Sequence, residues 1–144
     1  MTRILPFIAL ALLLGCSAQD DFAGYDKKSG DLGAFILQQS SKFGARAQQT
    51  NGLPQFTADW RYKEDADGFQ IYIVGDHFSQ LQSFLTAAFG PPAKALTTNE
   101  MAGTKSIGTY YGAQLGAALH YGWEMTRDGK QSTSLVVVRA AALK

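Results

Sequence analysis

The sequence predicts an α+β domain in which two helices pack on one face of a mostly antiparallel sheet of about five strands. Two segments repeat apolar residues at helical spacing, and several others alternate apolar and polar residues as half-buried strands do. Short polar turns join neighbouring alternating segments, which predicts hairpins and therefore antiparallel pairing. The expected order of elements is α-β-β-α-β-β-β.

Two helices are expected, over residues 31–47 and 76–89. Asp31 can cap the first helix, whose apolar stripe contains Leu32, Phe35, Ile36, Phe43 and Ala47. Asp76 is the expected N-cap of the second helix, and a glycine and two prolines at residues 90–92 end it. Its apolar residues recur at helical spacing: Phe78, Leu81, Leu85, Ala88 and Phe89.

Residues 56–74 predict the first hairpin. Its strands alternate around a core-facing set formed by Phe56, Ala58, Trp60, Tyr62, Phe69, Ile71 and Ile73. The acidic turn at residues 64–68 has the oxygen-rich composition that binds calcium, but it lacks the further carboxylates of a complete loop. We therefore expect no metal ion there.

Three more strands are expected, at residues 107–111, 117–125 and 133–140, after residues 93–106, which form either a long crossover loop or such a loop with a short strand in it. Trp123 falls on the core-facing side of the second of these strands, as Trp60 does in the first hairpin. In the last strand, Arg139 shares parity with Leu135 and Val137, so the pattern places these two outward and their neighbours Val136 and Val138 in the core.

The N-terminus resembles a bacterial lipoprotein signal peptide. Arg3 precedes an apolar run that is too short to span a bilayer and that ends in Leu13-Leu14-Gly15-Cys16, and Cys16 is the single cysteine of the chain. The resemblance covers residues 1–17. It implies that the Cys16 thiol carries a diacylglycerol, that cleavage follows Gly15, and that the protein is anchored to the membrane through lipid. Ser17, in place of an aspartate, favours the outer membrane, with the domain in the periplasm or, alternatively, at the cell surface.

This processing would divide the chain into a cleaved signal peptide at residues 1–15, a flexible tether at residues 16–30 and a single domain at residues 31–144. The full chain has 13 basic and 12 acidic residues and a net charge of +1; loss of Arg3 leaves 12 of each. A neutral domain has no basic surface for nucleic acid, so no nucleic-acid partner is expected. With Cys16 acylated, no thiol remains for catalysis or metal binding.

Few residues of the domain suggest catalysis. His77 and His120 lack a third ligand for zinc, so no metal or cofactor is expected. Asp59 and Glu124 share the polar side of the predicted sheet and would act as a general acid and base only if they lay within about 9.5 Å of each other. The sequence contains no nucleophile elbow, phosphate-binding glycine loop or zinc-protease motif.

The outward side of the predicted sheet combines apolar and polar residues, and it is the candidate binding face: Arg61, Tyr72, Val74, His120, Leu135 and Val137. Either the 93–106 loop covers its apolar residues, or they form a patch for a partner. We favour a lipid-anchored module that binds a protein or another envelope component. The alternatives are a small envelope hydrolase that uses Asp59, His120 or Glu124, and an inhibitor or immunity-like protein that inserts the 64–68 turn into a foreign enzyme.

Overall fold

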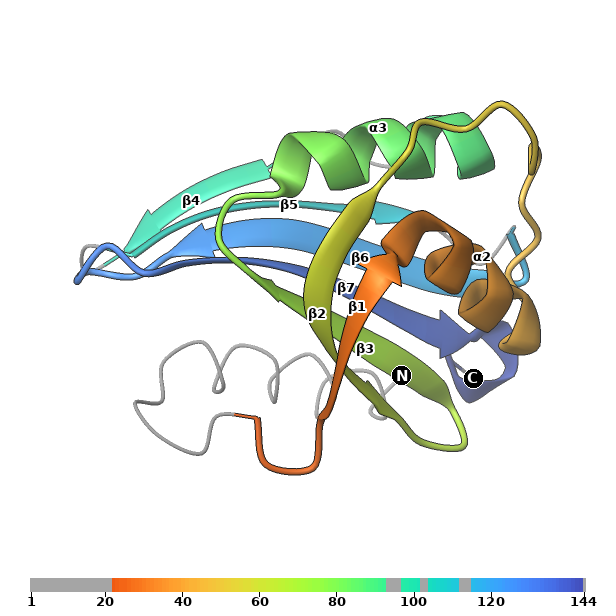
Figure 1. The fold of residues 1–144 in the computed structure, drawn as a ribbon, viewed down its shortest axis with the longest axis horizontal. Coiled ribbons are helices and arrows are strands. Elements are labelled where there is room, and N and C mark those ends of the chain that lie inside the picture. The colour runs from red at the N-terminus through yellow and green to blue at the C-terminus, as the bar shows by residue number, and fades with distance from the viewer. Residues whose placement is uncertain (1–21, 93–96, 102–103, 112–114, 144) are drawn as a thin grey trace.

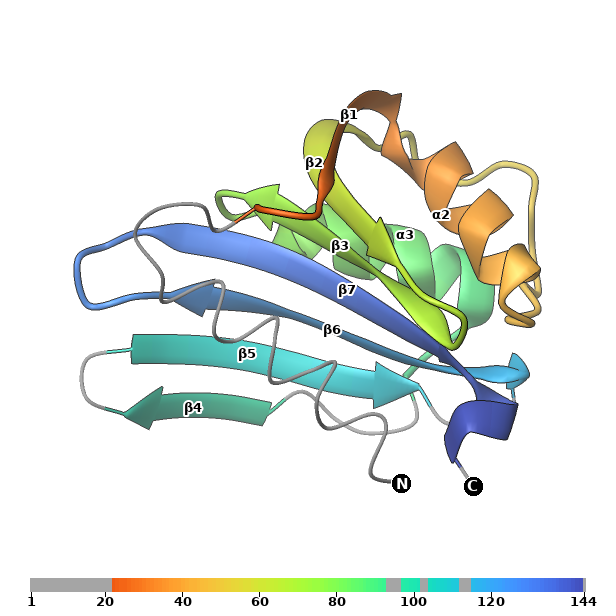
Figure 2. The same ribbon diagram turned by 90° about the horizontal axis from the view of Figure 1, so that it is seen from below.

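The computed structural model describes residues 22–92, 97–101, 104–111 and 115–143. Over these residues the chain forms one seven-stranded antiparallel sheet and two α-helices, which lie on the same side of the sheet (Figures 1 and 2). The spatial order of strands is β1-β2-β3-β7-β6-β5-β4. None of the helices in this part of the chain is both long enough and apolar enough to cross a membrane.

The described elements are seven strands, two α-helices and one short 3-10 helix. The strands are β1 (Asp26–Asp31), β2 (Thr57–Glu64), β3 (Gly68–Val74), β4 (Thr97–Met101), β5 (Thr104–Tyr111), β6 (Ala117–Met125) and β7 (Gln131–Arg139). The helices are α2 (Leu32–Lys42), α3 (Phe78–Phe89) and the short 3-10 helix η2 (Ala140–Leu143).

The predicted α+β class is confirmed, but the sheet has two strands more than expected. Both extra strands are at its edges: β1 pairs with β2, and β4 pairs with β5. β1 occupies residues that we assigned to the flexible tether, and β4 occupies part of the predicted 93–106 loop. An edge strand is held mainly by backbone hydrogen bonds to one neighbour, so its side chains need not alternate in polarity.

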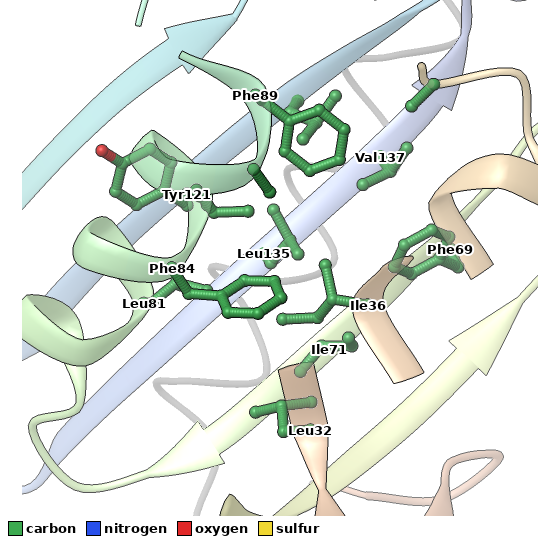
Figure 3. Packing of buried hydrophobic residues seen from close by; sticks show 14 of the residues in the cluster. Leu32, Ile36, Phe69, Ile71, Leu81, Phe84, Phe89, Tyr121, Leu135 and Val137 are labelled. Carbon is green, nitrogen blue, oxygen red and sulfur yellow. The ribbon is translucent and has the colours of Figure 1, made fainter. Parts of the chain in front are cut away.

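The main core lies between the sheet and the two helices. α2 contributes Leu32 and Ile36, and α3 contributes Leu81, Leu85 and Phe89, all at most 1 % exposed. Figure 3 shows these helices packing on side chains of the sheet that point toward them, among them Phe69, Ile71, Tyr121, Leu135 and Val137. Trp60 is also buried and Trp123 packs against the edge of this core, so the predicted inward placement of both tryptophans is confirmed.

The predicted orientation of the last strand is wrong. Leu135 and Val137 are fully buried beneath the helices, and Val136 and Val138 point to the other side of the sheet. The prediction assumed that Arg139, which shares parity with Leu135 and Val137, faces solvent. Instead its Nε donates to the Ala66 carbonyl at 3.1 Å and its guanidinium lies 4.8 Å from the Phe43 ring. A long side chain at a strand end can reach the core rim while its charged group stays near water.

Both helices begin close to their predicted starts. Asp31 caps α2 by accepting a hydrogen bond from the Ala34 N–H at 3.0 Å, as expected. α2 ends at Lys42 rather than near Ala47, because the chain turns at Gly44, whose φ of +92° suits a residue without a Cβ. His77 occupies the N-cap position of α3, and the Asp76 carboxylate accepts from the Phe78 N–H at 3.2 Å.

Candidate functional site

The outer face is the surface of the sheet opposite α2 and α3. Cross-strand partners point to the same side of a sheet, and Arg61 is opposite Tyr72, which in turn is opposite Ser134. Val74 is two residues after Tyr72 on β3 and therefore points to the same side. His120 on β6 is opposite Val136 on β7. Four of the six predicted binding residues therefore lie on the outer face: Arg61, Tyr72, Val74 and His120.

The other two predicted residues, Leu135 and Val137, are absent from this face because they are in the main core. β7 instead contributes Ser134, Val136 and Val138 to it. Val136 and Val138 are each 3 % exposed and pack with Ala142 and Leu143 of η2. The large hydrophobic side chain that remains exposed among the described residues is Val74, at 67 %.

β2 and β3 are unpaired over the first half of β2 and the end of β3, and a hollow lies between them. Their pairing runs only from Arg61 and Tyr72 to Glu64 and Phe69, although β2 begins at Thr57 and β3 continues to Val74. β1 stays paired with β2 throughout, while β3 stays paired with β7. This β2–β3 hollow has a volume of about 380 Å³ and is lined by Lys27, Asp59, Trp60, Arg61, Tyr72, Val74 and His77.

Charged groups of both signs line the hollow without pairing to one another. Lys27 is directly opposite Arg61 in the β1–β2 register, and Asp59 is two residues before Arg61 on β2. Within the described part of the chain, the ion pairs are Lys42 with Glu64 and Lys130 with Asp128, so neither cation of the hollow has a carboxylate partner there. Trp60 is 4 % exposed, and its buried indole N–H has no hydrogen-bond partner.

The residues just before β1 also pack on the outer face. The Phe22 ring lies 5.0 Å from the Tyr72 ring and 4.6 Å from the Arg61 guanidinium, which stacks over it. The Lys63 ammonium lies 5.5 Å from the Tyr25 ring, and burial, with a smaller contribution from Tyr72, raises the pKa of Tyr25 to about 12. These contacts could not be predicted from the sequence, because isolated aromatic residues in a polar segment carry no periodic signal.

The described residues of the 93–106 segment lie away from Tyr72 in the sheet. Its described residues 97–101 and 104–106 continue the sheet beyond β6, on the far side of β7 from β3. Tyr72 is instead partly covered by Phe22. The alternative that the loop shields the apolar residues is therefore wrong for the described residues.

The carboxylate pair considered for catalysis is too widely separated. β3 and β7 lie between Asp59 on β2 and Glu124 on β6. Three strand spacings of about 4.8 Å put at least about 14 Å between the two positions, beyond the range for a shared glycosidic bond. Burial raises the pKa of Glu124 and lowers the pKa of His120, so both favour their neutral forms.

The remaining candidates for metal binding and catalysis are His77 and the acidic turn at residues 64–68. Nδ1 of His77 is 2.9 Å from Oε1 of Gln80, and the described residues include no group of three side chains able to hold a metal ion. In the 64–68 turn, Asp65 accepts from the N–H groups of Asp67 and Gly68. Hydrogen bonds from Lys42 and Tyr62 lower the pKa of Glu64. The carboxylates of Glu64 and Asp65 are therefore already hydrogen-bonded within the domain.

A second, smaller hollow of about 340 Å³ lies on β4, β5 and β6. It is lined by Thr98, Asn99, Glu100, Lys105, Ser106 and Trp123. The Trp123 indole N–H donates to Gln131 at 3.0 Å, so its polar edge is already satisfied.

No family model, curated protein or solved structure matches the chain. The comparisons therefore contribute neither a fold family nor a function.

Proposed function

We propose that the protein is a lipid-anchored binding module of the bacterial cell envelope, attached through Cys16 to the outer membrane. The lipoprotein-like sequence at residues 1–17 supports the anchor. In this proposal the domain binds a protein or another envelope component through the outer face, at the β2–β3 hollow.

One observation carries the binding proposal. The hollow brings Arg61, Tyr72 and Val74 together beside Lys27, and Val74 is strongly exposed next to it. Arginine and aromatic residues supply most of the energy in many protein interfaces, and an exposed apolar residue beside them adds area that is released from water on binding. The separation of Asp59 from Glu124 argues against the hydrolase alternative.

Site-specific photo-crosslinking in intact envelopes tests the proposal. A photoreactive amino acid in place of Val74 should form discrete adducts with a partner. The matched control carries the same amino acid in place of Ser83, which is exposed on α3, on the opposite side of the sheet. Adducts of equal intensity from the two positions, or none from position 74, would contradict the proposed binding face.

A further inference from the structure

We propose that the β2–β3 hollow binds an extended peptide segment that carries a carboxylate side chain, with the carboxylate between Lys27 and Arg61. The inference rests on the proposed function, because it assumes that this hollow is the docking site, and it adds the chemical class of the ligand. Three properties of the hollow support it: its charge, its unpaired backbone and its apolar wall.

A cross-strand pair places two positive charges side by side at the hollow. Lys27 and Arg61 are direct partners in the β1–β2 register, and like charges at such positions destabilise a sheet. No described carboxylate forms an ion pair with either side chain. An anion between them would relieve the repulsion, and the guanidinium fork of Arg61 matches the two oxygens of a carboxylate.

Asp59 limits the charge of the ligand. It lies two residues from Arg61 on β2, which corresponds to about 7 Å along the strand, and lines the same hollow. Its carboxylate opposes a highly charged anion more strongly than a singly charged one. A single carboxylate at the Lys27 and Arg61 end, directed away from Asp59, fits this arrangement.

The separation of β2 from β3 leaves backbone groups without a cross-strand partner. Residues 57–60 of β2 pair with β1 on one side but have no β3 partner on the other, and β3 likewise has no β2 partner beyond Tyr72. An exposed strand edge is a template for an added extended segment, whose backbone supplies affinity while its side chains supply specificity. A peptide can use this edge, whereas a small anion cannot.

The apolar wall also favours a peptide over a lipid headgroup. Trp60, Tyr72 and the exposed Val74 line the hollow beside the two cations. In an extended peptide, side chains two positions apart point to the same side. A carboxylate at one position can therefore reach Arg61 while an apolar side chain two positions away contacts Val74.

A random heptapeptide display library, selected against the full protein purified from membranes in detergent, tests this inference. Aspartate or glutamate should be enriched at one position at least about tenfold over asparagine or glutamine, as expected for one charge-assisted contact. Arg61→Gln and Lys27→Gln should each remove most of this enrichment. Lys63→Gln is the matched control: it removes the same charge from β2, but Lys63 lies over Tyr25 and does not line the hollow.

Two variants, Arg61→Gln and Lys27→Gln, are needed to distinguish a loss of peptide binding from a loss of folding. Arg61 also stacks on Phe22, whereas Lys27 is an exposed residue of the edge strand β1 and its replacement relieves the like-charge repulsion, so Lys27→Gln should not lower the melting temperature. Selection of no peptides, of peptides without acidic enrichment, or of the same acidic peptides by all variants would overturn the inference. Binding of phosphatidylglycerol vesicles that depends on Arg61, without acidic peptide selection, would overturn it in favour of a lipid headgroup.

The selection also separates this inference from the proposed function. Persistent crosslinking from position 74 in envelopes, together with failure to select acidic peptides, would leave the docking site standing and reject the peptide carboxylate. Loss of crosslinking at position 74 together with failed selection would reject both.

Discussion

At the scale of single residues, Gly68 shows how closely two strands can constrain a side chain. It begins β3 opposite Val138, and a Cβ at this position would overlap the Val137 carbonyl oxygen. Because that oxygen belongs to the backbone of a central strand, it cannot move aside without disturbing the sheet. Only glycine fits this position.

Gly68→Ala should therefore lower the free energy of unfolding by about 1 to 3 kcal/mol, the usual cost of overpacking. Denaturant unfolding of the purified protein measures the change. Gly108→Ala is a suitable control, because a Cβ at position 108 would meet its nearest neighbour, His120, at 3.6 Å, an ordinary contact. An equal loss of stability in the two variants would show that the Val137 overlap is not the cause.

Glu124 predicts a dependence of stability on pH. Burial raises the pKa of its carboxyl group above the ordinary value of 4.5 in the folded protein, so the unfolded chain releases this proton first and stability falls as pH rises from that ordinary value to the folded-state pKa. Glu124→Gln should raise the melting temperature at pH 7 and have little effect at about pH 3, where the carboxyl group is mostly protonated in both states. Glu100→Gln, at an exposed position on β4, should show no such gain at pH 7. A gain of the same size at both pH values would contradict the explanation.

At the scale of elements, α3 was the most predictable part of the fold. Its apolar residues at helical spacing, followed by glycine and two prolines, correspond to a helix that ends at Phe89. Leu81 and Leu85 are 0 % exposed, as their periodicity predicted. The local pattern was sufficient here because one side of the helix packs on the sheet and the other faces water.

Leu85→Ala should lower the free energy of unfolding by about 2 to 5 kcal/mol, because it leaves a cavity beneath α3. Ser83→Ala, on the exposed side of the same helix, should change it by less than about 0.5 kcal/mol. Chemical denaturation of both variants provides the comparison. Similar losses would mean that α3 does not pack on the sheet through the side that contains Leu85.

The edge strands were less predictable than the helices. β1 consists of Asp-Lys-Lys-Ser-Gly-Asp, a composition typical of a linker, and it becomes a strand because β2 offers a free edge. The prediction of the orientation of the last strand was wrong for a different reason. β7 lies between β3 and β6 and is apolar on both faces, so alternation alone could not decide which set of valines meets the helices.

At the scale of the whole molecule, the contacts of Phe22 and Tyr25 bring the domain closer to the proposed lipid anchor than a long tether would. Five residues, 17–21, separate Cys16 from Phe22. A chain of this length spans at most about 20 Å. If Cys16 is acylated, the outer face near Phe22 lies within about that distance of the bilayer surface.

Cys16→Ser should abolish lipid attachment, because no thiol remains to accept the diacylglycerol. In Triton X-114 phase partitioning, the native protein should enter the detergent phase, and the variant should either accumulate as unprocessed precursor or appear in the aqueous phase. Ser17→Ala, which keeps the thiol, serves as the control. Mature Cys16→Ser protein in the detergent phase would contradict the lipoprotein assignment.

The sequence by itself determined the α+β class, the two helices and the inward residues of the first hairpin, because periodicity records which side of an element avoids water. It also singled out Arg61, Tyr72 and Val74, which the fold then placed around one hollow. Only the tertiary structure decided the edge strands, the orientation of β7 and the opening between β2 and β3. These depend on which strands become neighbours, and pairing between distant segments leaves little trace in the local pattern of either one.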